Sequence, residues 1–200
     1  MTSDIVVGNV YDKYGTKNPL YRWVVGGYFR SLSQLLPHPL PERILEVGCG
    51  EGHIAAWLSQ RAPRASLAAL DLSPGMLARA HIRYSSVDFV CGSAFELPFE
   101  TARFDLVLFL EVLEHLPEPR RALEEARRVC AGDLVASVPR EPTWRLLNLV
   151  RGAYWRDGGN TPGHLQHFGR RSFLELLQER WTVQQVATPV PWLMARCRSK

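Results

Sequence analysis

Apolar and polar positions along this chain follow two alternating patterns. The first is a helical spacing of apolar residues, which predicts an amphipathic helix over residues 19–36. The second is a short apolar run, which predicts a buried strand. Five such runs lie at 43–47, 66–70, 87–91, 104–110 and 134–138. Between them we expect helices over 52–61 and 119–129, and a third helix that begins with Ser73 as N-cap and Pro74 at the first helical position.

The last third of the chain departs from this alternation before returning to it. Residues 139–169 are rich in glycine, proline and aromatic residues, which predicts an ordered loop with a short helix at 144–150. A helix over 170–179 and two closing strands at 181–187 and 191–198 follow. The whole pattern predicts an α/β fold: a doubly wound, Rossmann-like, seven-stranded sheet, mostly parallel with an antiparallel C-terminal strand, and helices on both faces.

Length and composition narrow the class of protein. A chain of 200 residues predicts a single domain. The first residues lack the basic and apolar regions of a signal peptide, and no apolar run reaches the roughly 20 residues of a membrane-spanning helix. The four cysteines are scattered, without zinc-ligand or disulfide-scaffold spacing. We therefore expect a reduced, cytoplasmic location.

The charge of the chain is unevenly distributed. The net charge is +4, but residues 140–200 alone carry +6. Two interpretations are open: a solvated basic face, or a surface for a partner that is anionic or membrane-associated.

A glycine-rich turn joins the first predicted strand to the next helix. It comprises Glu46, Val47, Gly48, Cys49, Gly50, Glu51 and Gly52. Strand, glycine turn and helix make the nucleotide site of an open α/β sheet, because glycine lets the backbone turn sharply and approach a ligand. Glu46 is costly to bury without a partner, and Asp71 ends the second strand where an acid meets ribose hydroxyls. These residues predict a ligand with a ribose and a cationic group, although Asp71 has the alternative role of capping the following turn.

Four segments in order resemble the class I S-adenosylmethionine-dependent methyltransferases, in the small-molecule branch that includes quinone-pathway enzymes. They are Glu46–Gly52, Asp71–Met76, Cys91–Phe99 and Phe104–Leu116. The resemblance covers about residues 42–140. It implies S-adenosyl-L-methionine as cofactor, S-adenosyl-L-homocysteine as product, and methyl transfer by in-line displacement to a small-molecule acceptor, with a hydroxyl as one candidate group.

The resemblance also implies roles for the matched residues. The glycines and Cys49 would pass beside the methionine part of the cofactor, Glu46 would lie near its amino group or sulfonium, and Asp71 would bind the ribose diol. The remaining cofactor contacts would come from Leu72, Met76, Gly92, Ser93, Ala94, Leu110 and Glu111. Ser93 stands where the family often has aspartate on the adenine amine; it can accept one hydrogen bond, and Ala94 or Phe95 is the alternative adenine contact.

Within one methyltransferase domain, we expect an N-terminal lid and helix at 1–41 and a cofactor-binding core at 42–138. A substrate-side insertion at 139–169 and a closing helix and strands at 170–200 complete the domain. Tyr14, or alternatively Tyr11, is expected to meet the methionine carboxylate; apolar packing of these tyrosines is equally open.

Two histidines in the insertion are candidates for proton transfer. A neutral histidine, His164 or His167, could accept the proton of a hydroxyl acceptor, or the two could hold the loop through backbone bonds. The pair lacks an evident third ligand, so no metal site is predicted. Glu114 and His115 follow the fourth strand, and His115 is expected either to be part of the substrate pocket or to cap and position the loop before Pro117.

Two other functions are open. One is a non-catalytic protein that binds the cofactor and acts as a partner. The other is a dinucleotide-dependent oxidoreductase, against which His53 counts, because it stands where the dinucleotide fingerprint has its third glycine. The segment that starts at Glu111 lacks the Asn/Asp-Pro-Pro-Tyr-type motif of nucleic-acid methylation, so a nucleic-acid partner is not expected. Monomer and homodimer are both open.

Overall fold

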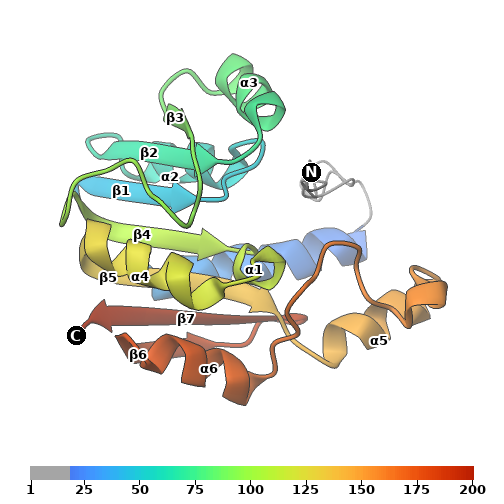
Figure 1. The fold of residues 1–200 in the computed structure, drawn as a ribbon. Helices are drawn as coiled ribbons and strands as arrows, with labels where there is room; N and C mark the ends of the chain where they lie inside the picture. Colours follow the sequence, from blue (N-terminus) through green and yellow to red (C-terminus); the bar gives the residue numbers. More distant parts are fainter. Residues whose placement is uncertain (1–18) are drawn as a thin grey trace, which may run out of the picture.

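The computed structural model describes residues 19–200, which form one seven-stranded sheet with helices on both faces (Figure 1). The strand order is β3-β2-β1-β4-β5-β7-β6, and β7 runs antiparallel to both of its neighbours. The strands are β1 Arg43–Val47, β2 Ser66–Asp71, β3 Asp88–Cys91, β4 Phe104–Leu110, β5 Cys130–Pro139, β6 Trp181–Ala187 and β7 Trp192–Ser199. The predicted fold class is confirmed.

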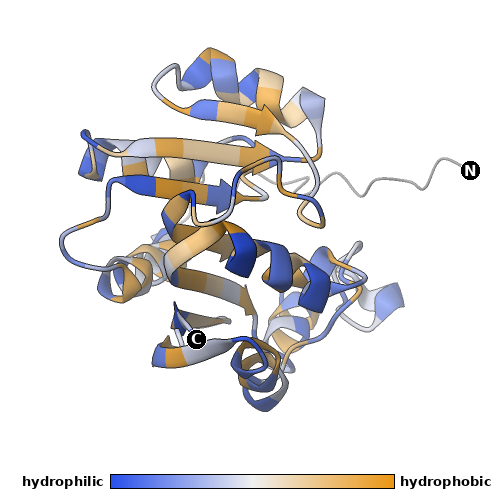
Figure 2. Ribbon diagram, turned by 60° about the vertical axis from the view of Figure 1, so that its left-hand side comes forward, coloured by the Kyte–Doolittle hydropathy of each residue, from blue (hydrophilic) through white to orange (hydrophobic). Residues whose placement is uncertain are grey.

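The helices divide into two layers because each presents one apolar face to the sheet. The helices are α1 Pro19–Leu35, α2 His53–Arg61, α3 Pro74–Arg83, α4 Pro119–Val129, α5 Thr143–Val150 and α6 Arg170–Gln178. Apolar side chains of α1, α2 and α3 share one core with one face of the sheet, and those of α4 and α6 share a second core with the other. Figure 2 shows the consequence: the central strands are mostly hydrophobic, whereas the helices carry hydrophilic outer faces.

Local signals place most boundaries close to the predicted ones. Ser73 caps α3 as expected, since its hydroxyl accepts the backbone N–H of Met76 at 3.4 Å. The main difference is β5, which begins at Cys130 rather than at residue 134. Gly132 explains this extension: a Cβ there would lie 2.1 Å from the carbonyl oxygen of Asp105, so only glycine allows β4 and β5 to approach so closely at this point.

The segment between β5 and α6 is ordered by its own polar contacts. Asn148, which is buried on α5, donates to the carbonyl of Gly159 at 2.8 Å and to the Thr161 hydroxyl at 3.2 Å. The Trp144 indole donates to the same hydroxyl at 2.9 Å. The 3-10 turn η2, Trp155–Asp157, follows α5, and both lie beyond the carboxyl ends of the parallel strands (Figure 1).

Two further expectations concern the N-terminus and membranes. Tyr11 and Tyr14 lie outside the described residues, so their role and that of a lid before α1 remain predictions. In α1, Leu32 and Leu35 are fully buried against the sheet.

Among the described helices, none is long and apolar enough to cross a membrane.

Candidate active site

The glycine turn between β1 and α2 is held in a conformation that side chains disfavour. Gly48, Gly50 and Gly52 have φ values of 75°, 53° and 76°. The N–H groups of Gly48 and Cys49 both donate to the Leu70 carbonyl, at 2.7 and 3.0 Å, which fixes the turn against the end of β2. A Cβ on Gly48 would lie 2.4 Å from Val112 Cγ2, whereas a Cβ on Gly50 would meet nothing within 4 Å. The turn is therefore packed on one side and open on the other.

Glu46 lies at the base of this turn and is 3% exposed. Burial raises the pKa of its carboxyl group from 4.5 to about 8, against the opposing effect of a hydrogen bond from the Ala55 backbone at the start of α2. The Oε2 atom has no hydrogen-bond partner among the described residues. A buried carboxylate with an unused oxygen is suited to a cationic ligand group, which would relieve the cost of burial.

Cys49, next to Gly48, is also buried, and burial raises the pKa of its thiol well above the ordinary range. The structure therefore makes Cys49 a packed, neutral thiol within the turn rather than a nucleophile.

Asp71 connects the glycine turn to the start of α3. Its Oδ2 accepts the N–H of Gly50 at 2.8 Å, and its Oδ1 accepts the N–H of Ser73 at 2.9 Å. The second contact is the capping role that the sequence left open. A carboxylate has about four acceptor positions, so both contacts leave room for a diol.

The residues expected around an adenine lie beside Asp71. Leu72 is half exposed, whereas Met76 is buried, with its sulfur 3.6 Å from Nη2 of Arg79. The N–H of Gly92 donates to the Asp71 carbonyl at 3.1 Å, which brings the end of β3 next to the end of β2. The hydroxyl of Ser93 accepts the backbone N–H of Phe95 at 3.1 Å, and Ala94 is partly buried at the same turn. Of Leu72 and Met76, the two side chains expected to pack on the adenine, Leu72 thus offers the more accessible surface.

The end of β4 is fixed by a hydrogen-bond network that sequence reasoning missed. Leu110 is buried, and the following residue, Glu111, has a φ of 62°, which is unusual for a residue with a side chain. The Glu111 carboxylate accepts the Ser137 hydroxyl at 3.2 Å and the Trp192 indole N–H at 2.7 Å. Because Ser137 uses its only proton there, the Tyr28 hydroxyl, 2.9 Å from Ser137 Oγ, donates to it.

This network determines what Glu111 offers to a ligand. Its carboxylate is directed toward β5 and β7, and its backbone N–H donates to the Ser137 carbonyl at 3.1 Å, so both groups are engaged within the protein. The backbone contact with the cofactor that the resemblance implied for Glu111 stays a prediction.

The two candidate histidines are separated. His167 is exposed, and its Nε2 lies 2.9 Å from Asn160 Oδ1. His164 is buried instead, and its ring lies 4.9 Å from that of His115 at an interplanar angle of 80°. Nδ1 of His115 donates to the Gly163 carbonyl at 2.9 Å, because a carbonyl can only accept. This bond ties the segment after β4 to the insertion at Gly163, and the expected role of His115 in the loop before Pro117 stays a prediction.

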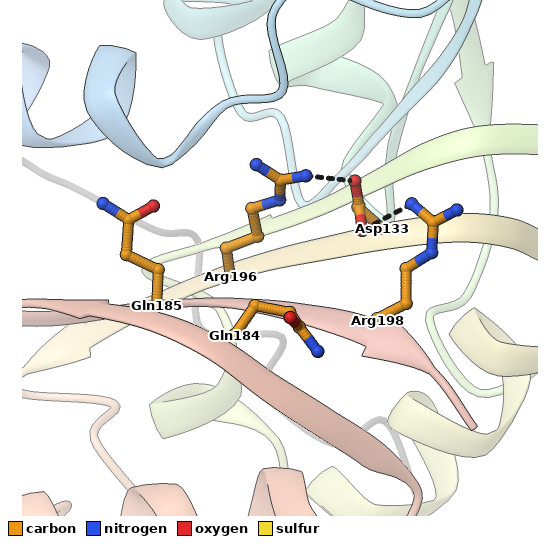
Figure 3. A pocket seen from close by; sticks show the side chains of 5 residues that line it. All are labelled: Asp133, Gln184, Gln185, Arg196 and Arg198. Carbon is orange, nitrogen blue, oxygen red and sulfur yellow. Dashed lines mark hydrogen bonds and ion pairs between the residues drawn. The ribbon is translucent and has the colours of Figure 1, made fainter.

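The basic residues of the C-terminal segment lie at several separate places in the structure, the first of which is β7. Arg196 and Arg198 on β7 both donate to Asp133, at 3.0 and 3.2 Å, in a pocket of about 350 Å³ that Gln184 and Gln185 complete (Figure 3). Asp133 lies near the start of β5, whereas the glycine turn follows the end of β1, which runs in the same direction as β5. This pocket therefore lies at the amino ends of the parallel strands, whereas the candidate active site lies at their carboxyl ends.

Other arginines of the segment are paired on helices or stand near the insertion. Arg171 pairs with Glu175, and Arg180 pairs with Glu124. The arginines that stand in or beside α5 and η2 are Arg140, Arg145, Arg151 and Arg156. Of these sets, only the arginines in and beside α5 and η2 lie near the substrate-side insertion.

The fold and the site together define a class. The strand order reverses between β1 and β4, and the glycine turn lies at this switch point, where open α/β sheets bind nucleotides. Residues 45–133 match the profile of a family described as "Methyltransferase domain". This matched range contains all four motifs and confirms the resemblance of residues 45–133 to the class I S-adenosylmethionine-dependent methyltransferases.

Relatives agree with this assignment. The chain is 42% identical over 98 residues to a malonyl-[acyl-carrier protein] O-methyltransferase of Herminiimonas arsenicoxydans, a match that covers 49% of this chain and 36% of the relative. It is 30% identical over 121 residues to a demethylmenaquinone methyltransferase of Thermotoga maritima, covering 60% and 53%. The chain thus spans about a third to a half of these relatives.

A solved structure extends the fold comparison to nearly the whole chain. An S-adenosylmethionine-dependent methyltransferase from Mesorhizobium loti superposes with a TM-score of 0.69 at 20% identity, and covers 88% of this chain and 99% of that one. At this identity the likeness concerns the fold.

Proposed function

We propose that this protein transfers a methyl group from S-adenosylmethionine to a small-molecule acceptor. The observation that carries the proposal is the buried Glu46 carboxylate, whose Oε2 lacks a partner among the described residues, at the base of a glycine turn that is open at Gly50. The bound cofactor would supply a methyl group on a positively charged sulfur. S-adenosylmethionine combines a ribose, an adenine and a cationic centre, which suit Asp71, Leu72 and Glu46 respectively.

The protein's own part in the reaction would be binding and alignment. Glu46 would face the amino group or the sulfonium, Asp71 would accept the two ribose hydroxyls, and the backbone of Leu110 and Glu111 would contact the methionine end. Leu72, Met76 and Ala94 would pack near the adenine, with the Ser93 hydroxyl as an acceptor for its amine. In-line displacement requires the acceptor to be held opposite the sulfur in a site that excludes water, and such positioning supplies much of the rate.

We further propose that the acceptor is an amphiphile with an anionic group, presented at a lipid surface. The support comes from α5 and η2, where apolar side chains stand exposed beyond the sheet. Val150 is 77% exposed and Trp155 is 69% exposed, and Leu146 is exposed on the same helix. Arg145, Arg151 and Arg156 lie among them, and apolar residues flanked by arginine are typical of segments that bind anionic membranes.

A hydroxyl acceptor would need a group to take its proton. His164 is the better placed of the two predicted histidines, because it is buried beside the end of β4, whereas His167 is exposed and paired with Asn160. We propose that His164, rather than His167, faces the acceptor.

Isothermal titration calorimetry tests the donor. S-adenosylmethionine and S-adenosylhomocysteine should each bind the folded protein with one-to-one stoichiometry, and NADH should not. Absence of binding to protein with a native circular dichroism spectrum would refute the proposed function. Turnover with phenols, quinols and acidic lipids would then separate a catalytic protein from a cofactor-binding partner.

A further inference from the structure

We propose that Glu114, His115 and His164 form a binding site for one divalent transition-metal ion of the zinc type. One carboxylate oxygen and one nitrogen from each of the two imidazoles all lie within 4.8 Å of one another. Zinc bonds to nitrogen and oxygen are about 2.0–2.2 Å long, so ligand atoms on one ion stand roughly 3.3 Å apart. Side-chain movements of about an ångström would therefore bring all three ligand atoms onto a common ion.

The site is built from two segments that are distant in sequence and locked together. Glu114 and His115 belong to the 3-10 turn η1, Leu113–His115, which directly follows β4, and His164 lies in the insertion. The N–H groups of Leu165 and Gln166 both donate to the Glu114 carbonyl, at 2.8 and 2.9 Å. The two ligand-bearing segments thus have a fixed relation that does not depend on the ligand side chains.

Burial and tautomer also favour metal binding. Glu114 is 2% exposed, and a carboxylate this deeply buried is normally paired or bound to a metal; His164 is 9% exposed. The hydrogen bond from Nδ1 of His115 to the Gly163 carbonyl places the lone pair of the neutral ring on Nε2. A metal-bound histidine typically donates its other N–H to a backbone carbonyl in this way.

The chemistry of the donor set selects the ion. Two imidazoles and one carboxylate, with no thiolate among them, suit zinc and its neighbours better than magnesium or calcium, which prefer oxygen ligands. Three protein ligands leave a fourth position for water or for a substrate oxygen. The sequence offered only His164 and His167, without a third ligand; the structure replaces His167 with Glu114 and His115.

The role of the ion rests on the proposed function, although its binding does not. Glu114 follows Glu111 by three residues, and the backbone of Glu111 is where the proposed function puts the methionine end of the cofactor. An acceptor oxygen in the fourth position would lose its proton more readily, because a bound divalent cation lowers the pKa of an oxygen ligand. With the ion bound, the lone pair of His164 would be used by the metal, so His164 would not act as the base and the proton would pass to solvent water.

Metal titration of the purified protein tests the site. Tag-free protein, stripped with a chelator, is titrated with Zn²⁺ by calorimetry and with Co²⁺ by visible absorption. We expect one equivalent to bind, with the absorption of a four-coordinate site that has nitrogen and oxygen ligands and no thiolate charge-transfer band. Glu114→Gln, His115→Gln and His164→Gln should each lower the affinity by more than about tenfold, since loss even of an outer-shell partner costs about that much.

His167→Gln is the matched control, because His167 lies in the same loop but is exposed and bound to Asn160. It should leave the affinity unchanged. Three results would overturn the proposal: no one-to-one binding to the wild-type protein, a thiolate band that reports a cysteine ligand, or equal affinity in the wild-type and His164→Gln proteins. In each case the three side chains are a hydrogen-bonded network that holds the loop.

The wild-type stoichiometry does not depend on whether a variant folds, and circular dichroism checks each variant. Metal titration without S-adenosylmethionine and S-adenosylmethionine titration of the stripped protein are independent measurements. Metal binding without cofactor binding contradicts only the proposed function, and the reverse result contradicts only the metal site.

Discussion

The backbone N–H of Gly50 donates to the Asp71 carboxylate at 2.8 Å, so the glycine turn after β1 is tied to the end of β2 before any ligand binds. This bond gives Asp71 two functions. It shapes the turn, and it holds acceptor oxygens in place for the ribose that we propose it binds. Preorganisation of this kind lowers the cost of ordering groups on binding.

The packing of the glycine turn predicts an asymmetry between two glycines. Gly48→Ala forces a Cβ against Val112 in addition to the positive φ, whereas Gly50→Ala meets only the positive φ. We expect urea denaturation to show Gly48→Ala losing about 1–3 kcal/mol more than Gly50→Ala, the usual cost of overpacking. Val112→Ala in the Gly48→Ala background should recover part of this difference. Equal losses at the two glycines would contradict the close packing against Val112.

Glu46 predicts a pH dependence of stability. Its pKa is raised from 4.5 to about 8 by folding, so between these values the folded protein keeps a proton that the unfolded chain releases. The free energy of unfolding should therefore fall as pH rises from about 4.5 to about 8. Glu46→Gln cannot titrate, so it should become progressively more stable than the wild type over this range. Melting temperatures measured at several pH values test this, and parallel profiles for the two proteins would rule it out.

The hydrogen bond from the Trp192 indole to Glu111 indicates that β7 helps to hold the end of β4 in place. Trp192→Phe keeps the ring contact with Tyr28 but removes the indole N–H that donates to Oε2 of Glu111. We expect a loss of about 1.5–3 kcal/mol in stability, the usual contribution of a hydrogen bond to a charged group, together with weaker cofactor binding. Trp155→Phe, at an exposed tryptophan, is the control. If the two variants behave alike, the Glu111 network does not position the site.

The exposed surface of α5 and η2 predicts binding to anionic lipid. The protein should sediment with phosphatidylglycerol vesicles but not with phosphatidylcholine vesicles, and salt should weaken the association. Val150→Ser and Trp155→Ser should reduce it, whereas Ile82→Ser, at an equally exposed apolar residue on α3, should not. Equal sedimentation of all three variants would place the lipid contact elsewhere, and no sedimentation would favour a soluble acceptor.

Sequence reasoning reached the elements and the cofactor motifs because both depend on local patterns. The spacing of apolar residues gave the strands and helices, and Glu46, the glycines and Asp71 lie at strand ends that the topology brings together. The early start of β5 was missed because Gly132 and Asp133 lack the apolar pattern of a strand. Their place in the sheet depends on contacts with Asp105, Arg196 and Arg198, which no local pattern reveals.

The arrangement of side chains on the substrate side was less predictable from the sequence, because it also depends on contacts between residues that are far apart in the chain. The hydrogen bond between Glu111 and Trp192 joins residues 81 positions apart. The cluster of Glu114, His115 and His164 likewise needs a loop whose path is set by Asn148 and Trp144. A possible signal was the Glu-His pair placed directly after a buried strand, since such strand ends face the ligand in open α/β sheets.

The most direct test of the central claim is calorimetric titration of S-adenosylmethionine into the wild-type protein and into Asp71→Ala. The account predicts one-to-one binding to the wild type and an affinity roughly 10- to 100-fold lower in the variant, as expected for loss of hydrogen bonds to a charged group. Asp88→Asn, at the exposed start of β3, should bind like the wild type. No binding to the folded wild type, or equal affinity in Asp71→Ala, would contradict the account.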